Sequence, residues 1–518
     1  MFPDKKSIKL LSVSIGHHDS NMAFCDGRVV KYIKLERLKQ EKRFGFQGLL
    51  GWQREVQHIW GLDVGAFDDI VLTFDPGSLP VSLKKHLASD ALHRLFSDKS
   101  KAERLTSAIC DYLGIRRAWL ISHHYSHALS TWMQESKPPD IQIVVDGLGD
   151  GRPWSVYRQD KLMAMGQIEN GSIGWGIRDA GKILGIKYGH YNDIAGKVMG
   201  LQSYGKVDHG YLQRLRQFDF SRINEVWSNS HWLAYKTDSL LGQLSGLDWV
   251  ATVHERMGEM LLDFFKRFAG QSEMIAYSGG VAQNVIWNAR LKAYFPNMVI
   301  APHACDEGLS LGSLEWLRRQ HGTDSLVLPN FPYAQSDVSV ASPSAETIQR
   351  AAQWLAEGRI VGWYQGHGEV GPRALGNRSI LMDPRLPHGK ALMNAVKRRE
   401  NYRPFGASVL QEHFQDYFSG PQDDFMLLAC AVNSIEFPAV THVDGTCRVQ
   451  SVGQDCTFFR QLLTQFHAIT GCPVLLNTSL NLAGKPIAAF PEAAKQLFFD
   501  SPIDAMIIGN EVHCRGTY

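Results

Sequence analysis

The chain has 518 residues, of which 44% are hydrophobic and 20% charged, a balance typical of globular proteins and not of disordered or fibrous ones. One hydrophobic core rarely serves a chain this long, so two or more domains are expected. The 54 basic and 52 acidic residues give a formal charge of +2, which indicates neither a nucleic-acid-binding nor a membrane-binding surface.

The cysteines and the N-terminus favour a soluble, cytoplasmic protein. None of the eight cysteines has CxxC spacing, so the sequence supports neither a zinc knuckle nor a thioredoxin-type motif. The first twenty residues enter a short strand instead of a signal-peptide core, and no segment approaches the ~20 apolar residues that a membrane span needs. We therefore expect buried, reduced thiols.

Short apolar strands alternate with helical segments through the first part of the chain. A hairpin is predicted from strands at 10–15, 22–25 and 29–33, with Asp26-Gly27 as a tight turn. Further strands are predicted at 141–145, 274–277 and 299–301, and helices at 128–133 and 258–268. This alternation predicts an α/β fold with ligands at the loops that follow the strands.

A domain boundary is expected near residues 328–345, which are rich in Pro, Ser and Ala and have no helical period. A strand at 360–364 then begins a second α/β unit. We predict one domain over residues 1–335 and another over 345–518.

His18 and Asp19, in the first loop, form a candidate acid/base group. Histidine is the side chain best suited to take a proton from a hydroxyl near neutral pH. A loop histidine is also often simply solvated.

Two histidines and two aspartates form a candidate metal site. His123 and His127 are four residues apart, so a helix would place both on one face. Asp146 and Asp306 each follow a predicted strand. Such a set suits a divalent ion such as iron, zinc or manganese. The plainer alternatives are an incidental HxxxH pair, a hairpin turn at Asp146 and a helix N-cap at Asp306.

Two glycine-rich stretches, 195–201 and 278–284, are predicted as loops that let the backbone approach a nucleotide closely. Neither has a Walker A or GxGxxG pattern, so each alone could equally serve a turn or helix packing. Together they favour an actin/hexokinase-type nucleotide cleft. The candidate nucleotide-binding residues here are Gly196, Lys197, Gly200, Ser278, Gly279, Gly280 and Asn284.

The densest set of candidate ligand-binding residues lies beyond the strand at 360–364. Arginines stand among glycines, a cation-rich stretch follows, and amide and hydroxyl side chains come after another apolar strand. The members are Arg373, Arg378, Lys397, Arg399, Arg403, Asn477 and Ser479. The planar fork of arginine matches phosphate oxygens, so this set predicts a phosphorylated ligand and a nucleotide. A solvated helix face is the alternative for 397–403.

Taken together, these motifs resemble the NodU/CmcH family of carbamoyltransferases. The matching segments are GHHDSNMA, HHYSHA, VVDGLGD, GKVMGL, SGGVAQN, CDEGLSLGS, GPRALGNRSIL, KRRENYRPFG and LLNTSLNLAGKPI, which span residues 9 to 510 or so. The resemblance implies an N-terminal actin-like domain, a duplicated ribonuclease-H type, and a C-terminal domain like the threonylcarbamoyl-adenylate synthases.

The resemblance also implies a reaction. The C-terminal domain would condense carbamoyl phosphate with ATP, accompanied by Mg²⁺, to carbamoyl-adenylate and pyrophosphate. The N-terminal domain, holding Fe²⁺ or another divalent metal, would pass the carbamoyl group to the hydroxyl of a small molecule, such as an intermediate of antibiotic biosynthesis. His18 and Asp19 would activate this acceptor, Arg373 and Arg403 would act on the carbamoyl donor, and the remaining cations, Asn477 and Ser479 would hold carbamoyl phosphate and ATP.

Three positions depart from the family pattern, namely Ala195, Gln283 and Ala407, where the family usually has Glu, Leu and Pro. The alternatives to an O-carbamoyltransferase are a threonylcarbamoyl-type tRNA-modifying enzyme and a non-catalytic actin-like ATP-binding protein. The first would need a basic stripe for tRNA, which the sequence lacks, and the second leaves the C-terminal arginines unexplained.

The acceptor and the oligomeric state are not readable from the sequence. Residues 44–52 and 227–249 are candidate acceptor-binding loops, with aromatic side chains at Trp227, Trp232, Tyr235 and Trp249.

Overall fold

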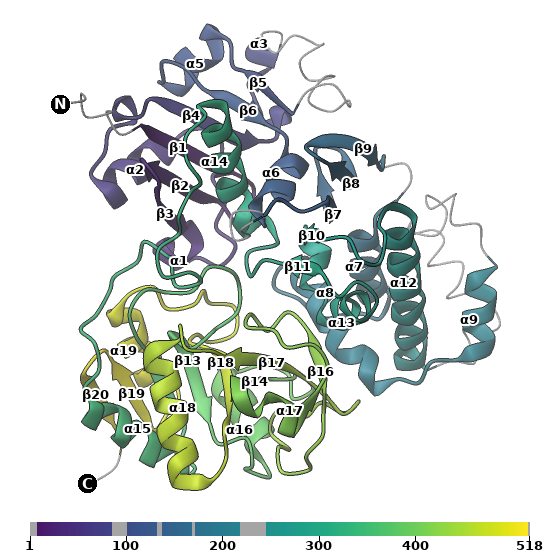
Figure 1. Cartoon of the computed structure of the whole chain (residues 1–518), viewed down its shortest axis with the longest axis vertical. Coiled ribbons are helices and arrows are strands. Elements are labelled where there is room, and N and C mark those ends of the chain that lie inside the picture. The colour runs from purple at the N-terminus through teal and green to yellow at the C-terminus, as the bar shows by residue number, and fades with distance from the viewer. Residues whose placement is uncertain (1–7, 85–100, 132–136, 168–170, 218–244, 516–518) are drawn as a thin grey trace.

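The computed structural model describes residues 8–84, 101–131, 137–167, 171–217 and 245–515. Three β-sheets organise these residues (Figure 1). The first two belong to the N-terminal part of the chain, in the upper half of the view and at its right, and the third fills the lower part.

The first sheet has the strand order β3-β2-β1-β4-β6-β5. Its strands are β1 (Lys9–Ile15), β2 (Asn21–Asp26), β3 (Val29–Lys34), β4 (Asp69–Phe74), β5 (Ala102–Arg104) and β6 (Trp119–Ile121). The hairpin predicted around Asp26-Gly27 is present, with Asp26 opposite Val29. β1 to β3 pair antiparallel, whereas β4 and β6 continue the sheet in parallel.

The second sheet repeats this plan in the order β11-β10-β7-β8-β9. Its strands are β7 (Ile141–Gly149), β8 (Arg152–Arg158), β9 (Lys161–Met165), β10 (Ile275–Ser278) and β11 (Met298–Ile300). Three antiparallel strands are again followed by two parallel ones. This repetition is the duplicated ribonuclease-H-type topology that the resemblance implied.

Two helices lie between these sheets and carry their shared core. α6 (His123–Ser130) packs on the second sheet and against α14 (Leu309–Gln320), which packs on the first. Outer helices cover the other faces: α2 (Trp52–Trp60) and α5 (Ser107–Leu113) on the first sheet, and α7 (Ile173–Ile183), α8 (Asp193–Leu201), α12 (Gly246–Phe268) and α13 (Val285–Tyr294) on the second.

The third sheet is mixed, in the order β15-β16-β17-β14-β18-β13-β12-β19-β20. Its strands are β12 (Val361–Tyr364), β13 (Arg378–Met382), β14 (Gly406–Leu410), β15 (Phe418–Ser419), β16 (Ala429–Val432), β17 (Thr446–Val452), β18 (Val474–Ser479), β19 (Ala505–Ile508) and β20 (Glu511–Cys514). Its main helices are α15 (Ala345–Ala356), α16 (Gly389–Lys397), α18 (Thr457–Thr470) and α19 (Pro491–Asp500). One core built on strands β12, β14 and β18 holds this region together.

The α/β fold class is confirmed, but two local predictions are wrong. Residues 195–201 are not a loop: they belong to α8, because Ile194 and Val198 pack into the core of the second sheet and hold the glycines in a helix. Asp146 does not follow its strand either. β7 continues to Gly149 past a register shift after Val145, and the turn falls at Asp150-Gly151, where both residues have positive φ.

Within the described parts of the chain, no helix is both long and apolar enough to cross a membrane.

Candidate functional site

One cavity of about 2060 Å³ connects the candidate residues of the N-terminal sheets with those of the C-terminal sheet. One end is lined by His18, Asp19, His123, Asp146 and Asp306, and the other by Arg373, Lys397, Arg399, Arg403, Arg448, Asn477 and Ser479. Helix α8 contributes Gly196, Lys197 and Gly200 to the wall between these ends. Two chemically different sites therefore share one space.

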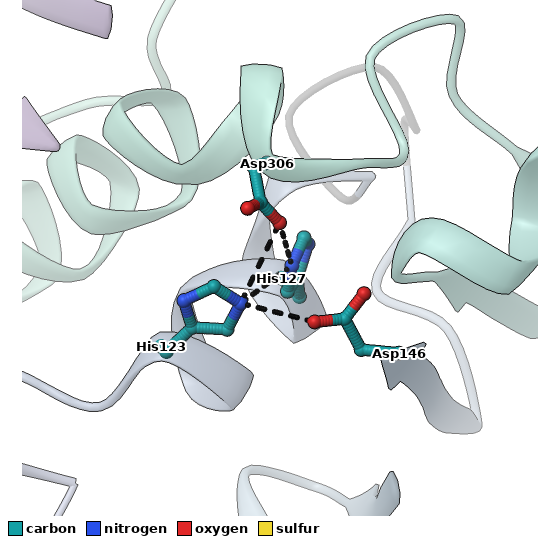
Figure 2. A group of neighbouring side chains, drawn as sticks. All are labelled: His123, His127, Asp146 and Asp306. Atoms are coloured by element: carbon teal, nitrogen blue, oxygen red, sulfur yellow. Dashed lines mark hydrogen bonds and ion pairs between the residues drawn. The ribbon is translucent and has the colours of Figure 1, made fainter. Parts of the chain in front are cut away.

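The four predicted metal ligands converge at the first end (Figure 2). Each offers one ligand atom, and these atoms lie within 4.8 Å of one another. His127 Nε2 is 3.1 Å from His123 Nε2 and 3.2 Å from Asp306 Oδ1. His123 Nε2 is 3.4 Å from Asp146 Oδ2. Two imidazoles and two carboxylates facing one point form a donor set that fits a divalent transition metal.

Local structure holds these ligands in place. Ser122 caps α6 by accepting a hydrogen bond from the backbone amide of Tyr125, so that His123 and His127 lie one helical turn apart on the same face. A Cβ atom at Gly149 would collide with the His123 ring, so glycine is needed there. Asp146 Oδ1 accepts a 2.7 Å hydrogen bond from the amide of Gly280, which fixes its other oxygen toward the histidines.

His18 lies beside the candidate metal site. Its Nδ1 is 3.0 Å from Asp19 Oδ2 and 3.6 Å from Asp306 Oδ2. Asn21 Nδ2 donates to the backbone oxygens of both Asp19 and Asp306, at 2.8 Å each, so it joins the two loops. The other oxygen of Asp19 is 3.1 Å from the buried ammonium of Lys34. The candidate acid/base pair therefore lies next to the candidate metal ligands.

Neighbouring carboxylates raise the pKa values of His18 and His123. Burial alone would lower the pKa of His18, but its hydrogen bond to Asp19 and the charge of Asp306 raise it. In the same way, the hydrogen bond to Asp146 and the charge of Asp306 overcome burial and raise the pKa of His123 to about 9. The site carries negative charge that attracts a cation.

Arg373, Arg399, Arg403 and Arg448, which we call the arginine cluster, line the other end of the cavity. Arg448 lies on β17, Arg373 on the loop between β12 and β13, and the remaining two follow α16. Within the described chain, no carboxylate forms an ion pair with any of the four. Nε of Arg373 and Nε of Arg448 are buried without a hydrogen-bond partner.

Burial and neighbouring positive charge lower the pKa values of three arginines of this cluster. Burial and the charge of Arg403 lower the pKa of Arg399 to about 9. Burial and Arg403 also lower the pKa of Arg373, and burial and Arg373 lower that of Arg448. Because like charges crowd together in a recess, an anion placed among them would remove the repulsion.

Two further predicted ligand residues shape the walls around the arginine cluster. The ammonium of Lys397 is 2.5 Å from the Ser479 carbonyl oxygen and 2.6 Å from that of Asn481, so it holds the turn after β18. Asn477 Nδ2 donates to Ser408 Oγ and to the Ala374 carbonyl oxygen, bracing the Arg373 loop, while its Oδ1 is buried without a partner.

Some predicted residues lie elsewhere. Arg378 is fully buried and does not line the cavity: its guanidinium donates to Gln365 O and Gly366 O, pairs with Asp337 and stacks on Tyr364 at 3.6 Å. Both terminal nitrogens of its guanidinium are bonded within the fold, so it is not available to a phosphate.

Of the glycine-rich stretch 278–284, some residues serve packing and others line the cavity. Ser278 and Gly279 do not line the cavity; Ser278 Oγ donates to the His127 carbonyl oxygen, and a Cβ at Gly279 would collide with Val145. Gly280 and Asn284 do line it, and Asn284 Nδ2 also bonds His254 Nε2 at 3.0 Å.

Of the aromatic candidates for the acceptor site, the one that the structure describes belongs to the core. Trp249 is a core residue of α12, 2% exposed, and Trp227, Trp232 and Tyr235 lie outside the described residues. Residues 46–49 of the predicted loop 44–52 do line the cavity. Nearer His18, Tyr191 lies edge-on to the imidazole at 6.4 Å between ring centroids, and Arg178 stacks on Trp175 at 4.9 Å.

Sequence reasoning also missed Arg448, although a cation inside the apolar strand TCRVQSV was a visible signal. Of the three departures from the family pattern, Ala195 and Gln283 line the cavity and Ala407 is buried in β14.

Comparisons with known proteins cover nearly all of the chain. Residues 9–314 match the family model described as carbamoyltransferase N-terminus, and residues 352–515 match carbamoyltransferase C-terminus. Nodulation protein NolNO of Sinorhizobium fredii is 28% identical over 451 residues, which cover 76% of this chain and 63% of that protein. An uncharacterized protein of Synechocystis, sll1178, is 26% identical over 97% of this chain and 96% of its own length. Among solved structures, (R)-2-hydroxyglutaryl-CoA dehydratase component A of Acidaminococcus fermentans covers 61% of this chain and 100% of its own, with 14% identity and a TM-score of 0.37.

Proposed function

The chain belongs to the carbamoyltransferase family, and from its cavity we propose that it is an ATP-dependent O-carbamoyltransferase acting in two steps. In the first, carbamoyl phosphate loses its phosphoryl group to water, and the resulting carbamate attacks the α-phosphorus of ATP and expels pyrophosphate. The products are carbamoyl-adenylate, pyrophosphate and phosphate. In the second, a small-molecule hydroxyl attacks the carbamoyl carbon, and AMP leaves.

The observation that carries the proposal is the arginine cluster. Four guanidinium groups without a carboxylate partner line one end of the cavity. Burial and the charge of neighbouring arginines lower the pKa values of Arg373, Arg399 and Arg448. Both substrates of the first step are phosphate anions, and a guanidinium binds phosphate oxygens with short, charge-assisted hydrogen bonds. The cluster would also stabilise the negative charge that develops as pyrophosphate departs.

His18 is suited to the second step. Its Nδ1 faces Asp19, which leaves Nε2 as the nitrogen that can take the proton of an attacking hydroxyl. Asp19 itself is held by Lys34 and Arg43, at 3.1 and 3.6 Å. As His18 gains a proton, the Asp19 carboxylate stabilises the imidazolium that forms.

The donor set at the same end fits Fe²⁺ or another divalent metal, held by His123, His127, Asp146 and Asp306. When bound, such an ion supplies Lewis-acid stabilisation of charge on a carbonyl oxygen. We further propose Mg²⁺ as the partner of ATP.

The acceptor is proposed to be a natural-product alcohol that carries a ring. Trp175 and Tyr191 line the cavity near His18, and flat aromatic faces bind sugar or planar rings well. Both steps would take place in one enclosed space, which keeps the reactive mixed anhydride from bulk water.

The test is pyrophosphate release by the purified protein. We expect release that requires both ATP and carbamoyl phosphate, and mass spectrometry of a panel of natural-product alcohols should find a carbamate. Release that instead requires threonine would favour the tRNA-modifying alternative. ATP binding without any pyrophosphate release would favour a non-catalytic protein.

A further inference from the structure

The loop that carries Arg373 is bound as firmly to the N-terminal region as to its own sheet. Glu369, which is fully buried, accepts hydrogen bonds at Oε1 from the backbone amides of Leu375 and Asn377, at 2.8 Å each, and so ties the loop to the start of β13. The next residue, Val370, has no exposed surface and belongs to the hydrophobic core of the N-terminal sheets. Consecutive side chains thus anchor one loop in two cores.

The following residue meets the loop that carries a metal ligand. Gly371 has a positive φ of 90°, and a Cβ atom there would collide with the carbonyl oxygen of Pro302. Pro302 begins the segment that leads to Asp306. Two residues after Gly371 the chain reaches Arg373, so the arginine cluster and the metal ligands are joined by a direct backbone contact.

Arg37, which follows the strand that carries Lys34, forms a hydrogen bond to this contact. It lies on α1 (Leu35–Lys39), three residues after Lys34, which holds Asp19. Its side chain is 2% exposed, and its Nη2 donates to the Gly371 carbonyl oxygen at 2.6 Å. Nε and Nη1 have no hydrogen-bond partner. A buried guanidinium held by a single backbone oxygen is costly to keep for stability alone.

The segment that links the two regions reinforces the same junction. Oε1 of Gln335 accepts a hydrogen bond from the backbone amide of Lys34. The backbone amide of Gln335 donates to the Gly368 carbonyl oxygen at 3.2 Å. Strand β3, the linking segment and residues 368–371 therefore form one hydrogen-bonded unit.

We infer that Arg37 is a positioning residue that fixes Arg373 against the Asp306 loop, so that the carbamoyl group passes between the two sites within the cavity that they share. This inference rests on the proposed function. Without the guanidinium, Gly371 is released from its only side-chain partner in the N-terminal region among the described residues. The wall then loosens, and water reaches carbamoyl-adenylate, which hydrolyses to AMP and carbamate; the carbamate decomposes to ammonia and carbon dioxide.

The experiment measures AMP formed from ATP and carbamoyl phosphate in the absence of any acceptor. The variant is Arg37→Met, which keeps the apolar stem of the side chain, and Arg37→Lys can restore a donor to Gly371. The matched control is Arg318→Met. Arg318 is also largely buried in the N-terminal region and donates to a backbone oxygen. Like Arg37 it does not line the cavity, but it bonds Glu315 and Thr323 instead of Gly371.

We expect the wild type and Arg318→Met to release about one equivalent of pyrophosphate per enzyme and then to slow, with little AMP formed. Arg37→Met should go on forming AMP at a rate at least ~10-fold higher than that of the wild type, and the rate of Arg37→Lys should lie between the two. Equal acceptor-free rates in Arg37→Met and wild type would overturn the inference, as would an increase of the same size in Arg318→Met. Complete loss of pyrophosphate release in Arg37→Met would also overturn it, because Arg37 would then be needed to build the anion site. Absence of pyrophosphate release from the wild type is a different result, which removes the proposed function itself.

Discussion

Replacing Arg448 by methionine should weaken the reaction and strengthen the fold. Arg448 is the member of the arginine cluster that lies within a strand, and burial together with the charges of Arg373 and Arg399 lowers its pKa. In the free protein it contributes repulsion and a buried Nε without a partner. Methionine keeps the apolar stem in place and removes only the charged head.

The two effects can be given rough sizes. A hydrogen bond to a charged group contributes about 1.5–3 kcal/mol, so kcat/KM for carbamoyl phosphate should fall about 10- to 150-fold. The substitution removes both the repulsion from the neighbouring arginines and the buried Nε that has no hydrogen-bond partner. Together these should raise the free energy of unfolding by on the order of 1 kcal/mol, which raises the melting temperature of a domain of 150–250 residues by about 2–4 °C.

The assay combines pyrophosphate release with thermal unfolding at several concentrations of inorganic phosphate. Phosphate at 100 times its Kd stabilises a protein by about 2.7 kcal/mol. Added phosphate should therefore raise the melting temperature of the wild type more than that of the variant, because the variant has lost one of the arginines that bind it. A variant that melts at a lower temperature than the wild type and keeps full activity would refute the reasoning, since Arg448 would then be a structural part of β17.

Three further predictions follow from single contacts. His123→Ala should lose divalent metal on dialysis, measured by elemental analysis, while pyrophosphate release stays within about twofold of wild type; loss of both would contradict two separate sites. Arg378→Met should lower stability by about 3–5 kcal/mol in urea unfolding, because it removes the cationic partner of the buried Asp337 carboxylate, yet KM for carbamoyl phosphate should stay unchanged. Burial lowers the pKa of His254 from 6.5 to about 3, so its neutral form stabilises the fold above pH 6.5 and this contribution is lost as the pH falls toward 3. This residue should therefore contribute a loss of about 2 kcal/mol between pH 7 and pH 5, measured as the difference between the wild type and His254→Gln over that range.

The parts of the site with a local signature could be predicted from the sequence. The four-residue spacing of His123 and His127 fixes their common face once the segment is helical, and the structure has them on α6. Asp306 is 179 residues from His127 along the chain, and its approach depends on the packing of α14 against α6, for which the sequence carries no local signal. The sequence grouped Asp306 with the histidines because of its chemistry and its position after a predicted strand, and the resemblance to a family implied the same set.

Errors arose where a residue type fits two environments. The glycines of α8 indicated a loop, but each costs a helix only about 1 kcal/mol, and the burial of Ile194 and Val198 outweighs that cost. Arg373 and Arg378 stand in one motif, yet the first lines the cavity and the second is bonded to the linking segment through Asp337. Which arginine remains available to a ligand is decided by distant partners.

The most direct test mixes the enzyme with γ-labelled ATP and carbamoyl phosphate, without an acceptor, and counts labelled pyrophosphate in a single turnover. The account predicts about one pyrophosphate per enzyme, none when carbamoyl phosphate is omitted, and none from Arg373→Ala. Pyrophosphate that forms equally well without carbamoyl phosphate, or from Arg373→Ala at the wild-type rate, would contradict the claim that the arginine cluster binds the phosphorylated carbamoyl donor.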